Sequence, residues 1–168
     1  MGRPEAYVGP SRTTSSHSLP LGATSVTTFL GSYEYQMDEK GRVSLPSAFR
    51  RGVEDPRFVL LQWKAPALSL FPLAAWAQTQ ERLLQFRRNQ PEAWSDVLAI
   101  TASAVEVSPD KQGRILIPSR LASAAALKGT VLLVGNIDRV EIWDPAAFEG
   151  TLSGRSGDFD RFATQIFG

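Results

Sequence analysis

The sequence contains no cysteine and only one histidine, His17, among its 168 residues. Without cysteine the chain can form neither a disulfide nor a thiolate metal site, which fits a reducing compartment. A single histidine, in a stretch that reads as unfolded, gives a zinc site or a Ser-His-Asp triad nothing to build on. We therefore expect no metal, no cofactor and no catalytic residues.

Long apolar runs and a strong net charge are also lacking. No segment approaches the roughly 20 apolar residues that a membrane-spanning helix needs, and the N-terminal region lacks the apolar core of a secretory signal. We therefore expect a cytoplasmic protein with no membrane partner. The net charge is +1, so nucleic-acid binding would need a local basic patch, or a patch multiplied by oligomerisation.

Both ends of the chain are poor in periodic apolar pattern. Residues 1–28 are rich in Ser, Thr, Gly and Pro, and we interpret them as a disordered extension because such a composition cannot bury enough apolar surface. The alternative, an arm reaching into a DNA groove, would have only Arg3 and Arg12 to contact phosphate. Residues 150–168 form a Gly- and Ser-rich C-terminal tail with three aromatic residues that either dock or stay free: Phe159, Phe162 and Phe167.

The strongest signal is an internal repeat at an offset of 72 residues. Each half carries an Asp-x-x-x-Arg turn followed by a short apolar strand and a proline: Asp38 to Pro46, and Asp110 to Pro118. Further on, the apolar run Val59–Leu61 falls on Val131–Leu133 without a gap. The halves match in chemistry and in strand phase over about 45 residues. Two equivalent β-hairpin units are therefore predicted.

The repeats are separated by a predicted helical hairpin. Residues 74–89 and 91–102 hold helix formers divided by Pro91. The predicted organisation is a first repeat over 29–78, a helical connector over 79–102 and a second repeat over 103–149. Because a single two-stranded hairpin is marginal in water, we expect the repeats to bury each other's apolar faces. The expected fold class is α+β, mainly β, in a pseudo-twofold β-barrel.

Two local expectations concern serine and tryptophan. Ser47 and Ser119 follow the motif prolines and are candidate N-caps of short helices. The tryptophans are expected in the core or at a subunit interface, because aromatic residues inside apolar runs are more often packing groups than base-stacking platforms: Trp63, Trp76, Trp94 and Trp143.

The paired motifs resemble those of the MraZ family, whose halves are similar to the AbrB and SpoVT swapped-hairpin DNA-binding domains. The resemblance covers Phe29 to about Phe148 and is specific, because two motifs recur at a fixed offset with matching flanks. It implies a swapped-hairpin barrel, in which hairpins of the two halves interleave, and ring-shaped homo-oligomers. It also implies binding to direct repeats in double-stranded promoter DNA, at the nucleoid, and transcriptional regulation of the division and cell-wall gene cluster.

Arg42 and Arg114 are the leading candidates for DNA contact. A guanidinium offers a rigid fork of donors suited to a phosphate or to the edge of guanine. The alternative is that each arginine only pairs with the aspartate four residues earlier and fixes its own turn, and both roles can hold at once.

The remaining motif residues have supporting roles. Lys40 and Lys111, on the turns, are candidate phosphate contacts, although solvation is the commoner role of a surface lysine. Asp38 and Asp110 are interpreted as orienting groups, because a bare carboxylate facing phosphate is repelled. The turn glycines, Gly41 and Gly113, allow a positive φ.

Two other binding functions stay open. One is an antitoxin-like or transition-state-regulator-like DNA binder acting as a dimer on palindromes, although two intact hairpins in one chain argue against it. The other is a scaffold that uses the barrel only to oligomerise. An enzyme is least favoured, because the arginine beside Asp38 or Asp110 keeps the carboxylate ionised and unsuited as an acid, and no Gly-rich phosphate loop precedes a helix.

Removal of residues 1–28 should leave the melting temperature and the affinity for DNA nearly unchanged, because their composition predicts no packed contacts. Thermal unfolding and gel-shift titration, each with the full-length chain as control, measure the two quantities. A large loss of affinity at an unchanged melting temperature would identify the segment as a DNA-binding arm.

Overall fold

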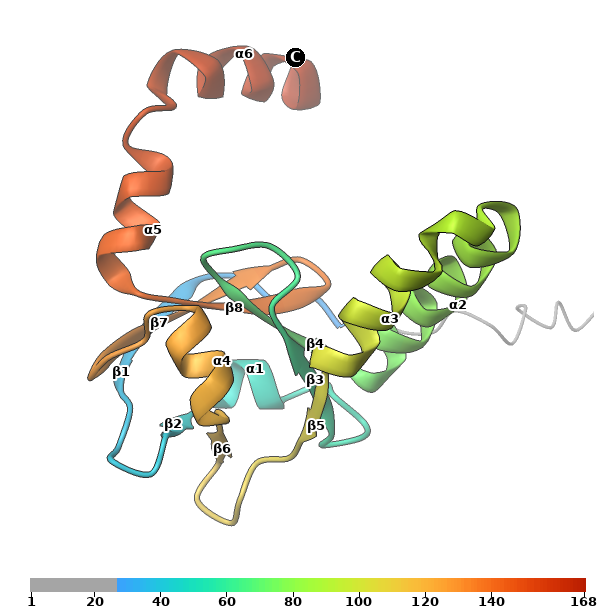
Figure 1. The fold of residues 1–168 in the computed structure, drawn as a ribbon. Helices are drawn as coiled ribbons and strands as arrows, with labels where there is room; N and C mark the ends of the chain where they lie inside the picture. The colour runs from blue at the N-terminus through green and yellow to red at the C-terminus, as the bar shows by residue number, and fades with distance from the viewer. Residues whose placement is uncertain (1–26) are drawn as a thin grey trace, which may run out of the picture.

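A computed structural model describes residues 27–168, and Figure 1 shows their fold. The disordered extension expected over residues 1–28 lies outside this range except for its last two residues. Thr27, the first described residue, donates a hydrogen bond from Oγ1 to the carbonyl oxygen of Gly52 at 2.8 Å. Helices are combined with antiparallel strand pairs, so the expected α+β class is confirmed.

Each repeat runs in the order strand, strand, short helix, strand, strand, helix. The first contains β1 (Ser32–Gln36), β2 (Arg42–Ser44), α1 (Ser47–Arg50), β3 (Phe58–Leu61), β4 (Leu68–Pro72) and α2 (Leu73–Asn89). A 3-10 turn (Pro91–Ala93) and α3 (Trp94–Ser103) complete the predicted helical hairpin. The second contains β5 (Val105–Val107), β6 (Arg114–Leu116), α4 (Ser119–Ala124), β7 (Thr130–Asn136), β8 (Arg139–Trp143) and α5 (Pro145–Leu152). The element order recurs, as the sequence repeat predicts.

Most strand pairing joins one repeat to the other. A six-stranded sheet has the order β1-β7-β8-β4-β3-β5, in which β1 pairs with β7, β4 with β8 and β3 with β5. Strands β2 and β6 pair with each other in a separate two-stranded ribbon. Val43 lies opposite Ile115 in the ribbon, and Ser69 lies opposite Glu141 in the sheet. In both pairs the two residues are equivalent positions of the repeats, 72 residues apart. A pseudo-twofold axis therefore passes through the centres of the ribbon and the sheet.

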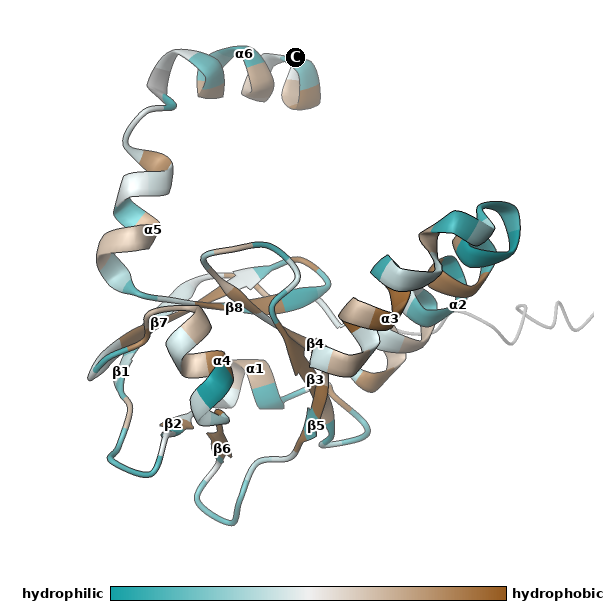
Figure 2. Ribbon diagram, in the orientation of Figure 1, coloured by the Kyte–Doolittle hydropathy of each residue, from teal (hydrophilic) through white to brown (hydrophobic). Residues whose placement is uncertain are grey.

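One apolar core lies between the sheet and the ribbon and draws on both repeats. Val43, Phe49 and Leu60 of the first repeat share it with Ile115 and Leu133 of the second. Figure 2 shows hydrophobic residues along the sheet strands and on the ribbon. The predicted mutual burial is therefore confirmed.

The predicted barrel is wrong, because β1 and β5 remain edge strands on opposite sides of an open sheet, whereas a barrel has no edges.

The repeat shifts by one residue in the third strand. Phe58 and Leu60 of β3 point into the shared core, together with Val131 and Leu133 of β7. The gapless alignment had placed Leu60 on Leu132, which is only half-buried. A continuous apolar run carries no alternation, so its sequence cannot reveal which residues face inward.

The expected serine N-caps are wrong. Ser47 and Ser119 are not N-caps: Pro46 and Pro118 hold the cap positions of α1 and α4, and neither helix has a side-chain cap. The fixed φ of proline sets the chain direction into these helices.

The tryptophans divide into two buried and two exposed residues. The ring of Trp76 lies 5.8 Å from that of Phe71, and the ring of Trp143 lies 5.5 Å from that of Phe148, as centroid distances. These equivalent aromatic pairs fix α2 and α5 to the outer side of the sheet. Trp63 and Trp94 are 49% and 59% exposed, so they do not belong to the core of the subunit.

The C-terminal tail is helical. Helix α5 extends beyond Phe148 to Leu152, and α6 (Ser156–Phe167) follows it. Figure 1 shows both helices rising from the β7 side of the sheet, away from the β2–β6 ribbon.

Replacement of Gly135 by alanine should destabilise the fold. A Cβ atom there would lie 2.5 Å from backbone atoms of Phe29 and Leu30, which pass close to β7. Such overpacking lowers the free energy of unfolding by about 1 to 3 kcal/mol. The matched control is Gly150→Ala in α5, where a Cβ meets nothing within 4 Å and alanine should stabilise the helix by roughly 0.5 to 1 kcal/mol. Urea unfolding measures both, and equal midpoints would contradict the close approach.

Candidate nucleic-acid interface

The β1–β2 turn is held by a single aspartate. Oδ1 of Asp38 accepts hydrogen bonds from the backbone N–H groups of Lys40 at 3.0 Å and Arg42 at 2.9 Å. Its Oδ2 accepts one from Nε of Arg42 at 2.7 Å. The aspartate therefore fixes both the backbone of the turn and the direction of the arginine side chain.

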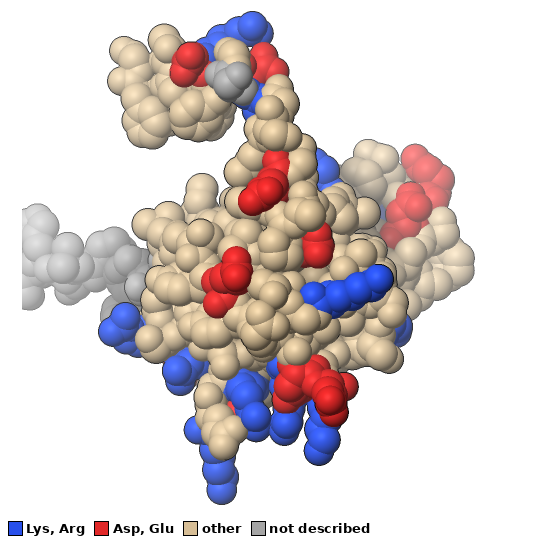
Figure 3. Space-filling view, turned by 90° about the vertical axis from the view of Figure 1, so that its left-hand side faces the viewer, with Lys and Arg blue, Asp and Glu red and all other residues tan. Residues whose placement is uncertain are grey.

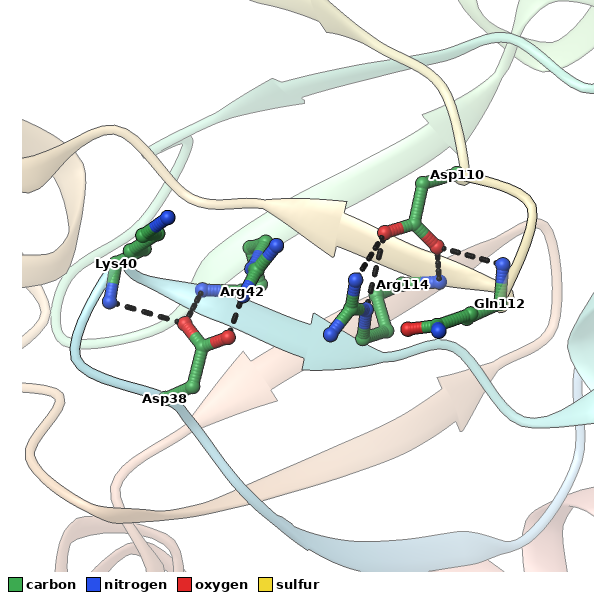
Figure 4. Close-up of polar contacts among 6 residues, drawn as sticks. All are labelled: Asp38, Lys40, Arg42, Asp110, Gln112 and Arg114. Atoms are coloured by element: carbon green, nitrogen blue, oxygen red, sulfur yellow. Dashed lines mark hydrogen bonds and ion pairs between the residues drawn. The ribbon is translucent and has the colours of Figure 1, made fainter.

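The β5–β6 turn repeats this network, as Figure 4 shows. Oδ1 of Asp110 accepts from the backbone N–H groups of Gln112 at 2.9 Å and Arg114 at 3.0 Å. Its Oδ2 accepts from Nε of Arg114 at 2.9 Å and from Nη2 at 2.8 Å. The predicted pairing of each arginine with the aspartate four residues earlier is therefore present in both turns.

The turn glycines are required by the backbone. Gly41 and Gly113 have φ values of +83° and +77°, a region that residues with a Cβ rarely adopt. A Cβ on Gly41 would also lie 2.8 Å from the carbonyl oxygen of Ile117. The local sequence thus specifies the turn through the aspartate at its start and the glycine before its arginine.

Both turn carboxyl groups are stabilised in the ionised form. The backbone hydrogen bond from Arg42 lowers the pKa of Asp38, and the side chain of the same arginine lowers it further. The corresponding contacts from Arg114 lower the pKa of Asp110 to about 2. Both groups are therefore charged near neutral pH, where a carboxylate is a poor proton donor.

The two arginines lie on the outer face of one ribbon. Val43 and Ile115 point into the core, so their strand neighbours point outward. The side chains of Arg42 and Arg114 are 33% and 28% exposed. Within residues 27–168, Asp38 binds Nε of Arg42, and Asp110 binds Nε and Nη2 of Arg114, so both terminal nitrogens of Arg42 and one of Arg114 are available to a ligand. The same face exposes 52% of Leu116, a residue that the sequence analysis did not select.

Arg50 is a second residue that the sequence analysis did not place in the site. Its Nε donates to the carbonyl oxygen of Leu45 at 3.1 Å. Its guanidinium lies against Gly113 of the other repeat, since a Cβ on that glycine would lie 2.9 Å from Cζ. The contact joins the repeats, so no local pattern in the sequence reveals it.

The turn lysines do not occupy equivalent positions. Lys40 and Lys111 are both exposed, but at the repeat offset Lys40 corresponds to Gln112 and Lys111 to Glu39. Figure 3 shows Lys and Arg side chains gathered at the lower end of the molecule, where Figure 1 places the two turns, with acidic atoms among them. The motif region is therefore basic at its surface but not uniformly so.

The described part of the chain offers neither a cluster of metal ligands nor a helix that could span a membrane. Within residues 27–168, no group of three His, Cys, Asp or Glu side chains could hold a metal ion. In the same range, every helix is too short or too polar to cross a membrane.

Comparison with known proteins identifies the family. Residues 28–96 and 100–164 match the family model described as "MraZ protein, putative antitoxin-like". A protein of Pediococcus pentosaceus named transcriptional regulator MraZ is 37% identical over 138 residues, which are 82% of this chain and 96% of the relative. Proteins of the same name from Acetivibrio thermocellus and Leuconostoc mesenteroides are 36% and 33% identical, over 82% and 80% of this chain and 93% and 94% of the relatives. The chain therefore belongs to the MraZ family.

Proposed function

We propose that this protein is a sequence-specific DNA-binding transcriptional regulator whose DNA-contacting surface is the β2–β6 ribbon with its two turns. Its relatives carry the name of a transcriptional regulator. One observation carries the proposal: two arginines, each oriented by its own aspartate, lie on the outer face of a single two-stranded ribbon. The expectation of a non-enzyme is part of this proposal.

A two-stranded ribbon with outward arginines suits the major groove of DNA. This groove admits a two-stranded β-ribbon, and an arginine fork can bind the O6 and N7 atoms of guanine. Asp38 and Asp110 hold the forks in place and reduce the entropy lost on binding. Leu116 offers an apolar contact for a thymine methyl group, while Lys40 and Lys111 contact phosphates on either side.

The proposed assembly follows from the arrangement of the repeats. Pairing of β1 with β7 and of β5 with β3 supports a swapped-hairpin relationship of the AbrB type within one chain. A ring-shaped homo-oligomer would present the basic surface many times, so that modest contacts by each subunit add up on direct repeats. The proposed site of action is promoter DNA of the division and cell-wall gene cluster, in the cytoplasm at the nucleoid.

Replacement of either motif arginine should weaken specific binding. Arg42→Ala and Arg114→Ala each remove a charge-assisted contact, at an expected cost of about 1 to 3 kcal/mol for each base-reading arginine. Gel shifts on the DNA upstream of the protein's own gene measure the loss, and size-exclusion chromatography monitors the oligomer. Arg88→Ala, at the exposed end of α2, is the matched control.

Lysine variants separate base contacts from phosphate contacts. Lys40→Ala and Lys111→Ala should weaken binding to all sequences and flatten its salt dependence. Unchanged affinity in both arginine variants would exclude a DNA role for the motif. Lost affinity with a collapsed oligomer would favour the purely structural role of the arginines, and an intact oligomer that binds no DNA at all would favour a scaffold.

Asparagine and alanine at Asp110 should have different effects. Asp110→Asn keeps an oxygen that can accept the backbone bonds of the turn but loses the ion pair with Arg114, so the fold should persist while sequence discrimination falls. Asp110→Ala loses both and should also unfold at lower urea. The ratio of specific to nonspecific affinity, together with the unfolding midpoint, tests this. Equal discrimination in Asp110→Asn and the unaltered protein would show that the carboxylate does not orient the arginine.

A further inference from the structure

The last helix carries an apolar stripe that the described part of the subunit leaves largely exposed. Its apolar residues are spaced by three and four positions and therefore share one helix face: Phe159, Phe162, Ala163, Ile166 and Phe167. Phe162 is 55% exposed and Phe167 is 85% exposed. Figure 1 shows α6 standing apart from both the sheet and the α2–α3 hairpin. Exposed apolar surface of this extent indicates a binding partner.

The same subunit has an apolar groove between the α2–α3 hairpin and the outer side of the sheet. Its volume is about 350 Å³. The buried ring of Phe71 contributes to its base, and Trp63 and Phe86, which are 49% and 47% exposed, border it. Leu83, Val97 and Ile100 complete its apolar lining. The groove explains why Trp63 is absent from the core.

The charges of the two surfaces are complementary. Asp160 lies beside the stripe on α6 and makes no ion pair within residues 27–168, and Arg82 lines the groove and is likewise unpaired in this range. Asp96 and Arg139 also line the groove, and Arg139 is paired with Asp138 at 2.8 Å, so Arg82 is the lining residue that offers an unpaired positive charge to the helix. With Asp158 and Arg161, α6 has a net negative charge. Contact would therefore bring unpaired opposite charges together around an apolar centre.

The anchoring of α5 separates α6 from the groove of its own subunit. Asp144 caps α5 by accepting a hydrogen bond from the backbone N–H of Ala147 at 3.0 Å, and Phe148 packs against Trp143 of β8. Helix α5 follows the end of β8, whereas the hairpin follows the end of the antiparallel neighbour β4, so the two helical segments leave the sheet in different directions (Figure 1). Each subunit thus presents a free helix and an open groove at different places.

We propose that α6 of one copy of this chain docks in the groove of a second copy, with its aromatic stripe against Trp63, Phe71 and Phe86. This inference deepens the self-association in the proposed function and rests on it, but not on DNA binding. The contact is heterologous, because helix and groove are different surfaces. Each subunit gives one helix and receives another, so the contact continues from copy to copy until a ring closes.

The test uses two complementary variants of the full chain. Phe162→Glu damages the helix and leaves the groove intact, whereas Phe86→Glu damages the groove and leaves the helix intact. Each variant alone should be a monomer by size-exclusion chromatography with light scattering. Mixed in equal amounts, they should form a one-to-one dimer through the one undamaged helix and groove. Gln165→Glu on α6 and Gln78→Glu on α2 add the same charge outside the contact and should keep the assembly of the unaltered protein.

The mixing result distinguishes this contact from other modes of association. Assembly through paired α6 helices would leave Phe86→Glu oligomeric and the mixture without a new dimer, and either result would overturn the proposal. A monomeric unaltered chain would overturn it as well. Thermal unfolding verifies that both exposed substitutions leave the fold intact. Gel shifts on a single DNA repeat are measured in parallel, so that failure of DNA binding is recognised separately from failure of assembly.

Discussion

The structure depends on the mutual burial of its two repeats. Neither repeat encloses a core alone, because Val43 and Phe49 lie in one apolar cluster with Ile115, Leu133 and others from the second half. The β2–β6 ribbon takes one strand from each repeat and closes the core opposite the sheet. Loss of packing between the halves would therefore also remove the platform that holds the two arginines.

In the proposed function, the same atoms of the motif hold the turn and position the arginine that contacts DNA. One carboxylate oxygen of each aspartate holds the turn backbone, and the other holds the arginine. Pairing with its own aspartate is thus not an alternative to ligand binding by the arginine. The aspartate fixes the guanidinium on the outer face, and in the proposed function the remaining terminal nitrogens would then bind DNA.

Much of this arrangement could be predicted from sequence, since the Asp38 and Asp110 turns and the repeat are local or periodic patterns. The barrel was wrong because edge closure depends on how strands far apart in sequence meet. The gapless alignment of β3 with β7 was wrong by one residue, because a continuous apolar run does not show which of its residues face inward. The contact of Arg50 with Gly113 joins the repeats, and only the three-dimensional structure reveals such a contact.

The pseudo-twofold axis through Val43 and Ile115 relates two turns that are alike in backbone but not in charge. The first presents Glu39 and then Lys40, whereas the second presents Lys111 and then Gln112. A dimer of identical half-length chains could not make this distinction. Joining both halves in one chain gives the ribbon a polarity, and in the proposed DNA complex this polarity would tell each subunit in which direction the sequence beneath it runs.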